Sequence, residues 1–288
     1  MSSYGGHSMH RPLKRVMVRR PTEAFAVDDI EAWNYVSRPD LAIAQQEHDD
    51  LVKLLKDDGI EVSYHDADLP EHADSIFVYD PVWVTDRGTI VLSLGKTLRE
   101  GEEQPLARAL EALDVPILGR LTGDARADGG DLLWLGPKTL VAGQGFRTNR
   151  QGAEQLRELL APMGVEVLTA ELPYFMGPNA CLHLLSLISI VDDDLAVVYP
   201  PLFPVPLWKL LQERGFRTVE VPESEFMTMA PNVLATAPGR CVMIEGNPIT
   251  QERLTAAGCD VRTYRGYELS LKAEGGPTCL TRPVLRQG

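Results

Sequence analysis

The 288-residue sequence is short of basic residues and has no long apolar run. Its 28 Lys and Arg stand against 41 Asp and Glu, which gives a formal net charge of −13. Such an acidic chain is a poor ligand for nucleic acid or for an anionic membrane surface, so we expect neither as a partner. The longest apolar candidate, residues 181–191, contains His183 and two serines and is too short to cross a bilayer.

Cysteine is also scarce, and its spacing excludes common uses of this residue. The four cysteines lie far apart, without a C-x-x-C pair, which predicts free thiols and neither a disulfide framework nor a zinc site. The pair Cys181 and His183 lacks a second pair to complete a tetrahedral site, so we expect no metal and no other cofactor. Residues 1–12 are polar and lack the apolar core of a signal peptide. We therefore expect a flexible tail at residues 1–12 and a cytoplasmic protein.

A repeated pattern runs through the rest of the chain. Five times an amphipathic helical stretch ends in a turn-forming residue that is followed directly by a short strand-like run. The stop residues are at positions 59, 114, 164, 215 and 258, at intervals of 55, 50, 51 and 43 residues. Four of them are glycine, which ends helices because it adopts positive φ without steric cost. The near-constant spacing predicts repeated units around an axis.

Two or three further strand-like runs lie between successive helices. A plain doubly wound α/β fold also alternates helices with strands, but it has fewer strands per helix. No G-x-G-x-x-G follows the first strand at residues 15–20. We therefore expect residues 13–288 to form one closed domain of five β-rich units with helices outside and a polar pocket at the axis.

The segment before the C-terminus contains a candidate nucleophile. Cys279 follows Gly275, Gly276 and Pro277, where the backbone can approach a ligand closely. An ionised cysteine is a strong nucleophile and needs a base beside it. Of the six histidines, His183 is the best candidate, because it opens an otherwise apolar strand. A buried structural cysteine and a satisfied core histidine are the alternatives.

Carboxylates and arginines supply candidate binding groups. Asp128 precedes Gly129 and Gly130 at the entrance to a strand, where it either closes a tight turn or faces the pocket. Asp74 and Asp80 are six residues apart, so they share one face if residues 75–79 form a strand, and two such carboxylates indicate a cationic ligand. Arg99 and Arg147 lie in loops, either solvated or available to bind a carboxylate.

These segments together resemble the guanidine-modifying superfamily, which has a five-bladed α/β-propeller fold and includes arginine deiminases, amidinotransferases and dimethylarginine hydrolases. The resemblance covers nearly the whole chain. It consists of four motifs and a cysteine in order: F-V-x-D-P at 77–81, G-G-D at 129–131, R-T-N-x-x-G-A-E at 147–154, H-L at 183–184 and Cys279. The H-L-x-S setting of His183 is most similar to the dimethylarginine hydrolases.

The resemblance implies a role for each residue. Cys279 would be the nucleophile, His183 the acid and base, and Asp128 the carboxylate that orients the histidine. Asp74 and Asp80 would bind the substrate guanidinium, and Arg99 and Arg147 its carboxylate. The chain departs from the hydrolases at Tyr79, where they have Glu, and from the deiminases at Leu185, where they have Asp. Residues 275–279 are more similar to deiminases.

We thus expect a metal-independent hydrolase that cleaves a C–N bond of a guanidine, such as a methylated arginine, through a covalent intermediate on Cys279. An amidinotransferase or an arginine or agmatine deiminase of the same superfamily is the alternative within this class. A catalytically inactive binding protein is the alternative from another class. The sequence leaves the oligomeric state open, with a homodimer among the options.

Overall fold

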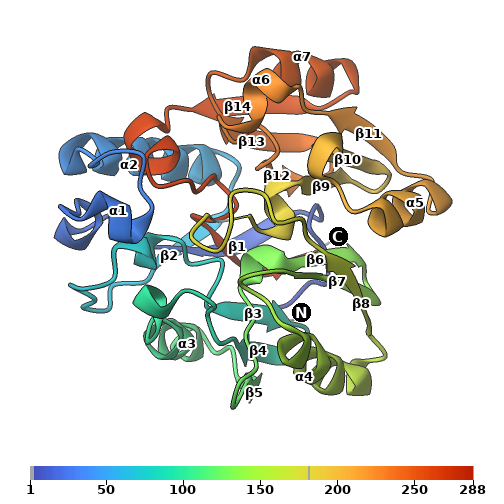
Figure 1. Cartoon of the computed structure of the whole chain (residues 1–288), viewed down its shortest axis with the longest axis horizontal. Helices are drawn as coiled ribbons and strands as arrows, with labels where there is room; N and C mark the ends of the chain where they lie inside the picture. Colours follow the sequence, from blue (N-terminus) through green and yellow to red (C-terminus); the bar gives the residue numbers. More distant parts are fainter. Residues whose placement is uncertain (1–2, 181, 288) are drawn as a thin grey trace.

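The structure is a computed structural model that describes residues 3–180 and 182–287, and it forms a five-bladed α/β propeller. Each blade is a three-stranded sheet, and the helices lie around the outside of the five sheets (Figure 1). The strand orders are β15-β1-β2, β3-β4-β5, β6-β7-β8, β9-β10-β11 and β12-β13-β14. The predicted fold of five β-rich units is therefore confirmed.

Every blade has the same internal pairing. Its first two strands pair antiparallel, and the third pairs parallel with the middle one after a helical crossover, as parallel neighbours require. The strands are β1 (Leu13–Val18), β2 (Glu61–Tyr64), β3 (Val82–Thr85), β4 (Gly88–Val91), β5 (Ile117–Arg120), β6 (Leu132–Gly136), β7 (Thr139–Gln144), β8 (Glu166–Glu171), β9 (Ile188–Asp192), β10 (Leu195–Val198), β11 (Arg217–Glu220), β12 (Leu234–Ala237), β13 (Arg240–Ile244), β14 (Asp260–Tyr264) and β15 (Arg282–Arg286).

The five crossover helices are those that the sequence predicts. They are α2 (Leu41–Asp57), α3 (Glu103–Glu111), α4 (Arg150–Leu160), α5 (Val205–Glu213) and α7 (Pro248–Ala256), and short helices α1 (Ile30–Trp33) and α6 (Glu223–Phe226) lie between them. Asp40 caps α2 and Asn149 caps α4 by accepting backbone N–H groups. The predicted stops at positions 59, 114, 164, 215 and 258 all have left-handed backbones, with φ between 63° and 100°. No helix in the described part of the chain is long and apolar enough to span a membrane.

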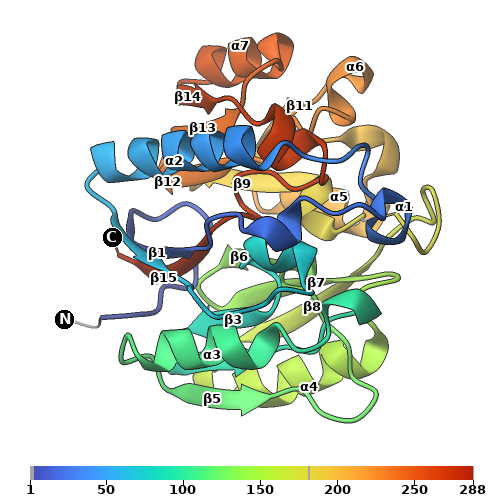
Figure 2. The same cartoon turned by 90° about the vertical axis from the view of Figure 1, so that its left-hand side faces the viewer.

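The two ends of the chain close the propeller in one blade. The last strand, β15, pairs antiparallel with β1, and Figure 2 shows the two strands side by side. Residues before β1 continue this contact: Gly5 N donates to Val284 O at 2.8 Å, and the His7 ring is buried and stacks on Trp134 at 4.1 Å. The tail predicted for residues 1–12 is therefore packed from Gly5 onward, because backbone hydrogen bonds hold a segment whose side chains are mostly polar.

Two predicted strand starts are helical turns. Residues 75–79 were expected to be extended, but Ala73–Ile76 is a 3-10 turn that leads into β3. The strand expected from His183 onward begins only at Ile188, after a 3-10 turn at Leu184–Ser186. Asp74 and Asp80 therefore do not share one strand face, contrary to the prediction. In each blade, the segment just before the first strand turns across the axis and brings its polar side chains there.

Candidate active site

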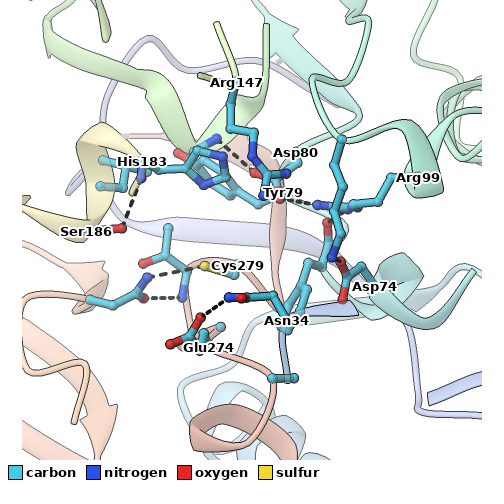
Figure 3. Close-up of a pocket in the computed structure, with 18 of the residues that line it drawn as sticks. Asn34, Asp74, Tyr79, Asp80, Arg99, Arg147, His183, Ser186, Glu274 and Cys279 are labelled. Carbon is cyan, nitrogen blue, oxygen red and sulfur yellow. Dashed lines mark hydrogen bonds and ion pairs between the residues drawn. The ribbon is translucent and has the colours of Figure 1, made fainter. Parts of the chain in front are cut away.

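A cavity at the propeller axis is lined by all five blades. The segments before β3, β6, β9, β12 and β15 contribute Asp80, Gly130, His183, Asn232 and Cys279 in that order. The cavity is also lined by four other site residues that the sequence predicts, namely Asp74, Tyr79, Arg99 and Arg147. Asp128 does not line it, because it is fully buried behind His183. Figure 3 shows the Cys279 sulfur between His183 and Arg147 on one side and Asn34 and Glu274 on the other.

Asn232 holds the candidate nucleophile in place. Its Nδ2 donates to Cys279 Sγ at 3.3 Å, and its Oδ1 accepts from Thr278 N at 3.0 Å. One amide thus fixes both the sulfur and the backbone that carries it. A donor that faces the sulfur also favours the thiolate over the thiol.

The two glycines before Cys279 allow this close approach. A side chain at Gly275 would lie 2.0 Å from the Phe77 ring, and one at Gly276 would lie 2.6 Å from the Asn232 amide carbon. Non-bonded contacts of a Cβ atom are essentially never this short, so any larger residue would move the segment. The Gly-Gly pair was predicted to let the backbone approach a ligand, and the close neighbours that the structure gives it are the Phe77 ring and the Asn232 side chain.

His183 is buried and lies against Asp128. His183 Nε2 is 3.0 Å from Asp128 Oδ2, and Asp128 Oδ1 accepts from Gly95 N at 2.7 Å. The imidazole also fits over Gly130, where a methyl group would lie 2.3 Å from His183 Nδ1. Nε2 therefore faces the carboxylate, and Nδ1 lies on the side of the ring next to Gly130.

The surroundings of Asp128 keep its carboxyl group ionised. Burial by itself raises the pKa of Asp128, but the hydrogen bond and charge of His183, with the charges of Arg147 and Arg99, outweigh it and lower the pKa. Arg147 Nη1 lies 3.9 Å from Asp128 Oδ2. An ionised carboxylate behind an imidazole orients the ring and stabilises its protonated form.

Asp80 is part of a buried ionic network. Its Oδ1 accepts from Gly130 N at 2.9 Å, and its Oδ2 accepts from Arg99 Nη1 at 2.6 Å. Arg99 also donates to both carboxylate oxygens of Glu102 and to the Phe77 carbonyl. Burial raises the pKa of Glu102 to about 7, against the opposing effect of Arg99. Four of the five N–H groups of Arg99 are therefore used within the described part of the chain.

Asp74 is held by a second cation near the entrance. Lys96 Nζ donates to Asp74 Oδ2 at 2.6 Å and to the Trp33 carbonyl at 2.9 Å, and the Tyr35 hydroxyl donates to Asp74 Oδ1 at 2.9 Å. The Lys96 ammonium also lies over the Trp33 ring, 4.8 Å from its centre. Lys96 therefore places a positive charge in the cavity wall, and the sequence analysis did not identify it.

Tyr79 contributes little more than its backbone to the cavity. Its hydroxyl points to Met9 Sδ at 3.8 Å, and the Arg282 guanidinium lies 4.0 Å from the centre of its ring. Burial raises the pKa of the Tyr79 phenol, despite the opposing effect of Arg282. The phenol is thus part of the packing beneath the cavity floor.

The sequence prediction did not include several polar residues of the cavity, among them Asn34, Lys96, Asn232 and Glu274. None of them belongs to a recognisable motif. Glu274 directly precedes the Gly275–Cys279 segment that contains the candidate nucleophile. Cys181, and with it the Cys181–His183 pair, lies outside the described residues. Among residues 3–180 and 182–287, no group of three or more His, Cys, Asp or Glu side chains is arranged to hold a metal ion.

Comparisons with known proteins agree with this geometry. The arginine deiminase family model matches residues 77–208 and 202–286. An N(G),N(G)-dimethylarginine dimethylaminohydrolase of Streptomyces coelicolor is 29% identical over 275 residues, which cover 94% of this chain and 96% of that protein. The enzyme of the same name from Pseudomonas aeruginosa is 24% identical over 272 residues, 93% of this chain and 98% of that protein.

The solved structures show the same fold. A variant of the Pseudomonas aeruginosa enzyme in complex with citrulline has a TM-score of 0.79 and 22% identity, over 94% of this chain and 98% of its own. The family-model match spans well over half of the sequence, and the predicted site residues other than Asp74 lie within the matched ranges. The chain therefore belongs to the arginine deiminase family, within the guanidine-modifying superfamily of hydrolases and amidinotransferases.

Proposed function

We propose that the protein is a cysteine-dependent hydrolase that cleaves a C–N bond of a guanidine, with an arginine derivative such as a methylated arginine as substrate. The observation that carries this proposal is the cavity that joins Cys279 with the His183–Asp128 pair and the Asp80 carboxylate. The relatives named as dimethylarginine dimethylaminohydrolases support the same class of substrate.

In the first half-reaction the thiolate of Cys279 attacks the planar guanidinium carbon. Asp80 accepts hydrogen bonds from the guanidinium, because a carboxylate oxygen can accept more than the one donor it has from the protein. The C–N bond to the departing amine breaks as His183 gives that nitrogen a proton. The products are the free amine and a thiouronium group on Cys279, with a neutral His183.

In the second half-reaction the neutral His183 takes a proton from water. The resulting hydroxide attacks the thiouronium carbon and the C–S bond breaks, which restores the thiolate; the added hydroxyl group loses its proton to the released amine or to solvent, giving a neutral ureido product such as citrulline. His183 is then protonated again, ready for the next cycle. Asn232 stabilises the sulfur as an anion at the start and at the end of this sequence.

The structure changes the expected role of Arg99. Since four of its five N–H groups already have partners, we propose that Arg99 positions Asp80 and does not itself clamp a substrate carboxylate. Arg147 and Lys96 stand at the entrance, and their positive charges are better placed for a carboxylate. Asp74 then acts mainly by holding Lys96.

A panel of guanidines tests the proposal. Arginine, methylated arginines, agmatine and guanidinoacetate are incubated with the protein, and ureido product and released amine are measured. We expect turnover with at least one arginine derivative. Loss of the carboxylate in agmatine should lower kcat/KM by about 10- to 100-fold, and Arg147→Ala should reduce this discrimination. A preference of the wild type for agmatine would contradict the carboxylate contact.

Variants and an added amine separate the alternatives. Cys279→Ser should abolish turnover, whereas the same change at Cys241 or Cys259 should leave activity within about tenfold. Transfer of the amidino group to an added amine, with little ureido product, would identify an amidinotransferase. The absence of both products, and of any covalent labelling of Cys279 by a chloroacetamidine, would identify a binding protein without activity.

A further inference from the structure

Glu274 lines the cavity and takes no part in the proposed mechanism. Its Oε2 accepts a hydrogen bond from Asn34 Nδ2 at 3.0 Å, across two segments that are 240 residues apart. Figure 3 shows Asn34 and Glu274 pointing toward each other on the side of Cys279 opposite Arg147. Burial raises the pKa of Glu274, while the Asn34 hydrogen bond and the charge of Lys96 oppose this rise.

The charges around the cavity distinguish Glu274 from the other carboxylates. Three carboxylates line the cavity. Asp74 is paired with Lys96 at 2.6 Å and Asp80 with Arg99 at 2.6 Å, so each already has a cation in contact. Glu274 has only the neutral amide of Asn34 as a hydrogen-bond partner within the described residues. A partly buried carboxylate of this kind gains most from a ligand that brings a positive charge.

The backbone at this position supports a role in binding. Glu274 has φ of 56°, in the left-handed region that residues other than glycine adopt at a cost. Gly275 and Gly276 follow directly, and glycine would adopt this left-handed conformation without the cost that Glu274 has. Asn34 also has a left-handed backbone, with φ of 61°, because it ends α1 as its C-cap. Strained residues that point into a cavity are found mainly at functional sites.

Glu274 stands toward the entrance and not at the reacting end. Its two neighbours Asn34 and Lys96 line both the cavity and the groove outside it, whereas Asp80, His183 and Cys279 line only the cavity. Arg147 also lines both spaces. Where the cavity opens, Lys96 and Arg147 thus lie near the Glu274 carboxylate, and this combination of charges fits an α-amino acid; Asp29 and Glu31 line only the groove outside.

We propose that Glu274 is a specificity-determining residue that binds the ammonium group at the far end of the substrate, while Arg147 and Lys96 bind the carboxylate. This inference rests on the proposed function and names its substrate class: a guanidine that carries a free amino group, as in an α-amino acid. The Asn34 side chain also carries a carbonyl oxygen, a group that can accept a hydrogen bond from an ammonium group.

Binding to a protein that cannot turn over tests this. In the Cys279→Ser background, dissociation constants are measured by calorimetry for arginine, for agmatine (without the carboxylate) and for 5-guanidinopentanoate (without the amino group). Glu274→Gln is then added, because it keeps the shape and hydrogen-bonding capacity of the side chain and removes its charge. Glu252→Gln, at an exposed position of α7 outside the cavity, is the matched control.

We expect Glu274→Gln to raise the dissociation constant of arginine by about 10- to 100-fold, the size of a lost charge-assisted hydrogen bond. The dissociation constant of 5-guanidinopentanoate should change by less than about twofold. The dissociation constant of agmatine should rise by a similar factor, because agmatine keeps the amino group. Equal weakening of all three ligands, or none, would overturn the inference while the proposed function stands. If the parent protein binds none of the three and no methylated arginine either, the proposed function itself fails and this inference fails with it.

Discussion

Replacement of Gly130 by Ala tests whether His183 acts from the position seen in the structure. Gly130 does not have a left-handed backbone, so alanine is compatible with its local conformation. The added methyl group, however, would lie 2.3 Å from His183 Nδ1 and 2.7 Å from its Cγ. Carbon and nitrogen atoms pack at about 3.5 Å or more. The imidazole must therefore move by roughly 1 Å, which breaks its 3.0 Å contact with Asp128.

The expected effect is large on turnover and modest on stability. A general acid and base contributes about 10²- to 10⁴-fold to a rate, so kcat should fall within this range. Overpacking of one methyl group destabilises a protein by about 1 to 3 kcal/mol, which a domain of this size tolerates. Thermal melts confirm that the variant is folded, and single-turnover kinetics on the best guanidine substrate give the rate.

A double-mutant cycle makes the test specific. If the methyl group acts by displacing the imidazole, adding Gly130→Ala to His183→Ala should lower the rate by less than about twofold further, since neighbours that act through one contact are not additive. Gly145→Ala is the control, because the atoms nearest to its methyl group would be those of Leu172, at an ordinary 3.4 Å. A folded Gly130→Ala protein with a normal rate, or additive losses in the cycle, would refute the reasoning about His183.

Three further predictions concern the electrostatics and strain of the site. Burial raises the pKa of Asp131 to about 6, so the folded protein binds this proton more tightly than the unfolded chain and its stability falls as pH rises from about 4 to 6. Asp131→Asn should flatten this part of the stability profile, by up to about 3 kcal/mol in urea unfolding; an unchanged slope would contradict the pKa. Arg99→Met leaves Asp80 and Glu102 buried without their cation and should lower the free energy of unfolding by about 3 to 5 kcal/mol, whereas a loss below about 1 kcal/mol would show that the network is not needed. Glu274→Gly should be more stable than Glu274→Ala by about 1 kcal/mol, because only glycine relieves the left-handed backbone; equal melting temperatures would argue against strain.

The sequence by itself determined the parts of this protein that depend on neighbouring residues. The five helix ends follow from single turn-forming residues that adopt positive φ, and Gly215 shows this with φ of 77°. The spacing of those ends predicted five units, because each unit has about the same number of residues. The motifs around Cys279, His183 and Asp128 indicated which side chains face the axis, since each motif precedes the first strand of a blade.

The tertiary structure decided which of those side chains contact each other. Asn232 reaches Cys279 across 47 residues and His183 reaches Asp128 across 55, and no local pattern encodes contacts between different blades. The partners of Arg99 were also decided by the fold. The sequence made Arg99 a candidate to bind a substrate carboxylate, but in the structure it forms ion pairs with Asp80 and Glu102. Glu274 differs from any surface glutamate only through its position beside Asn34 and its left-handed backbone. Such partnerships depend on which loops the closed ring of blades brings together at its axis.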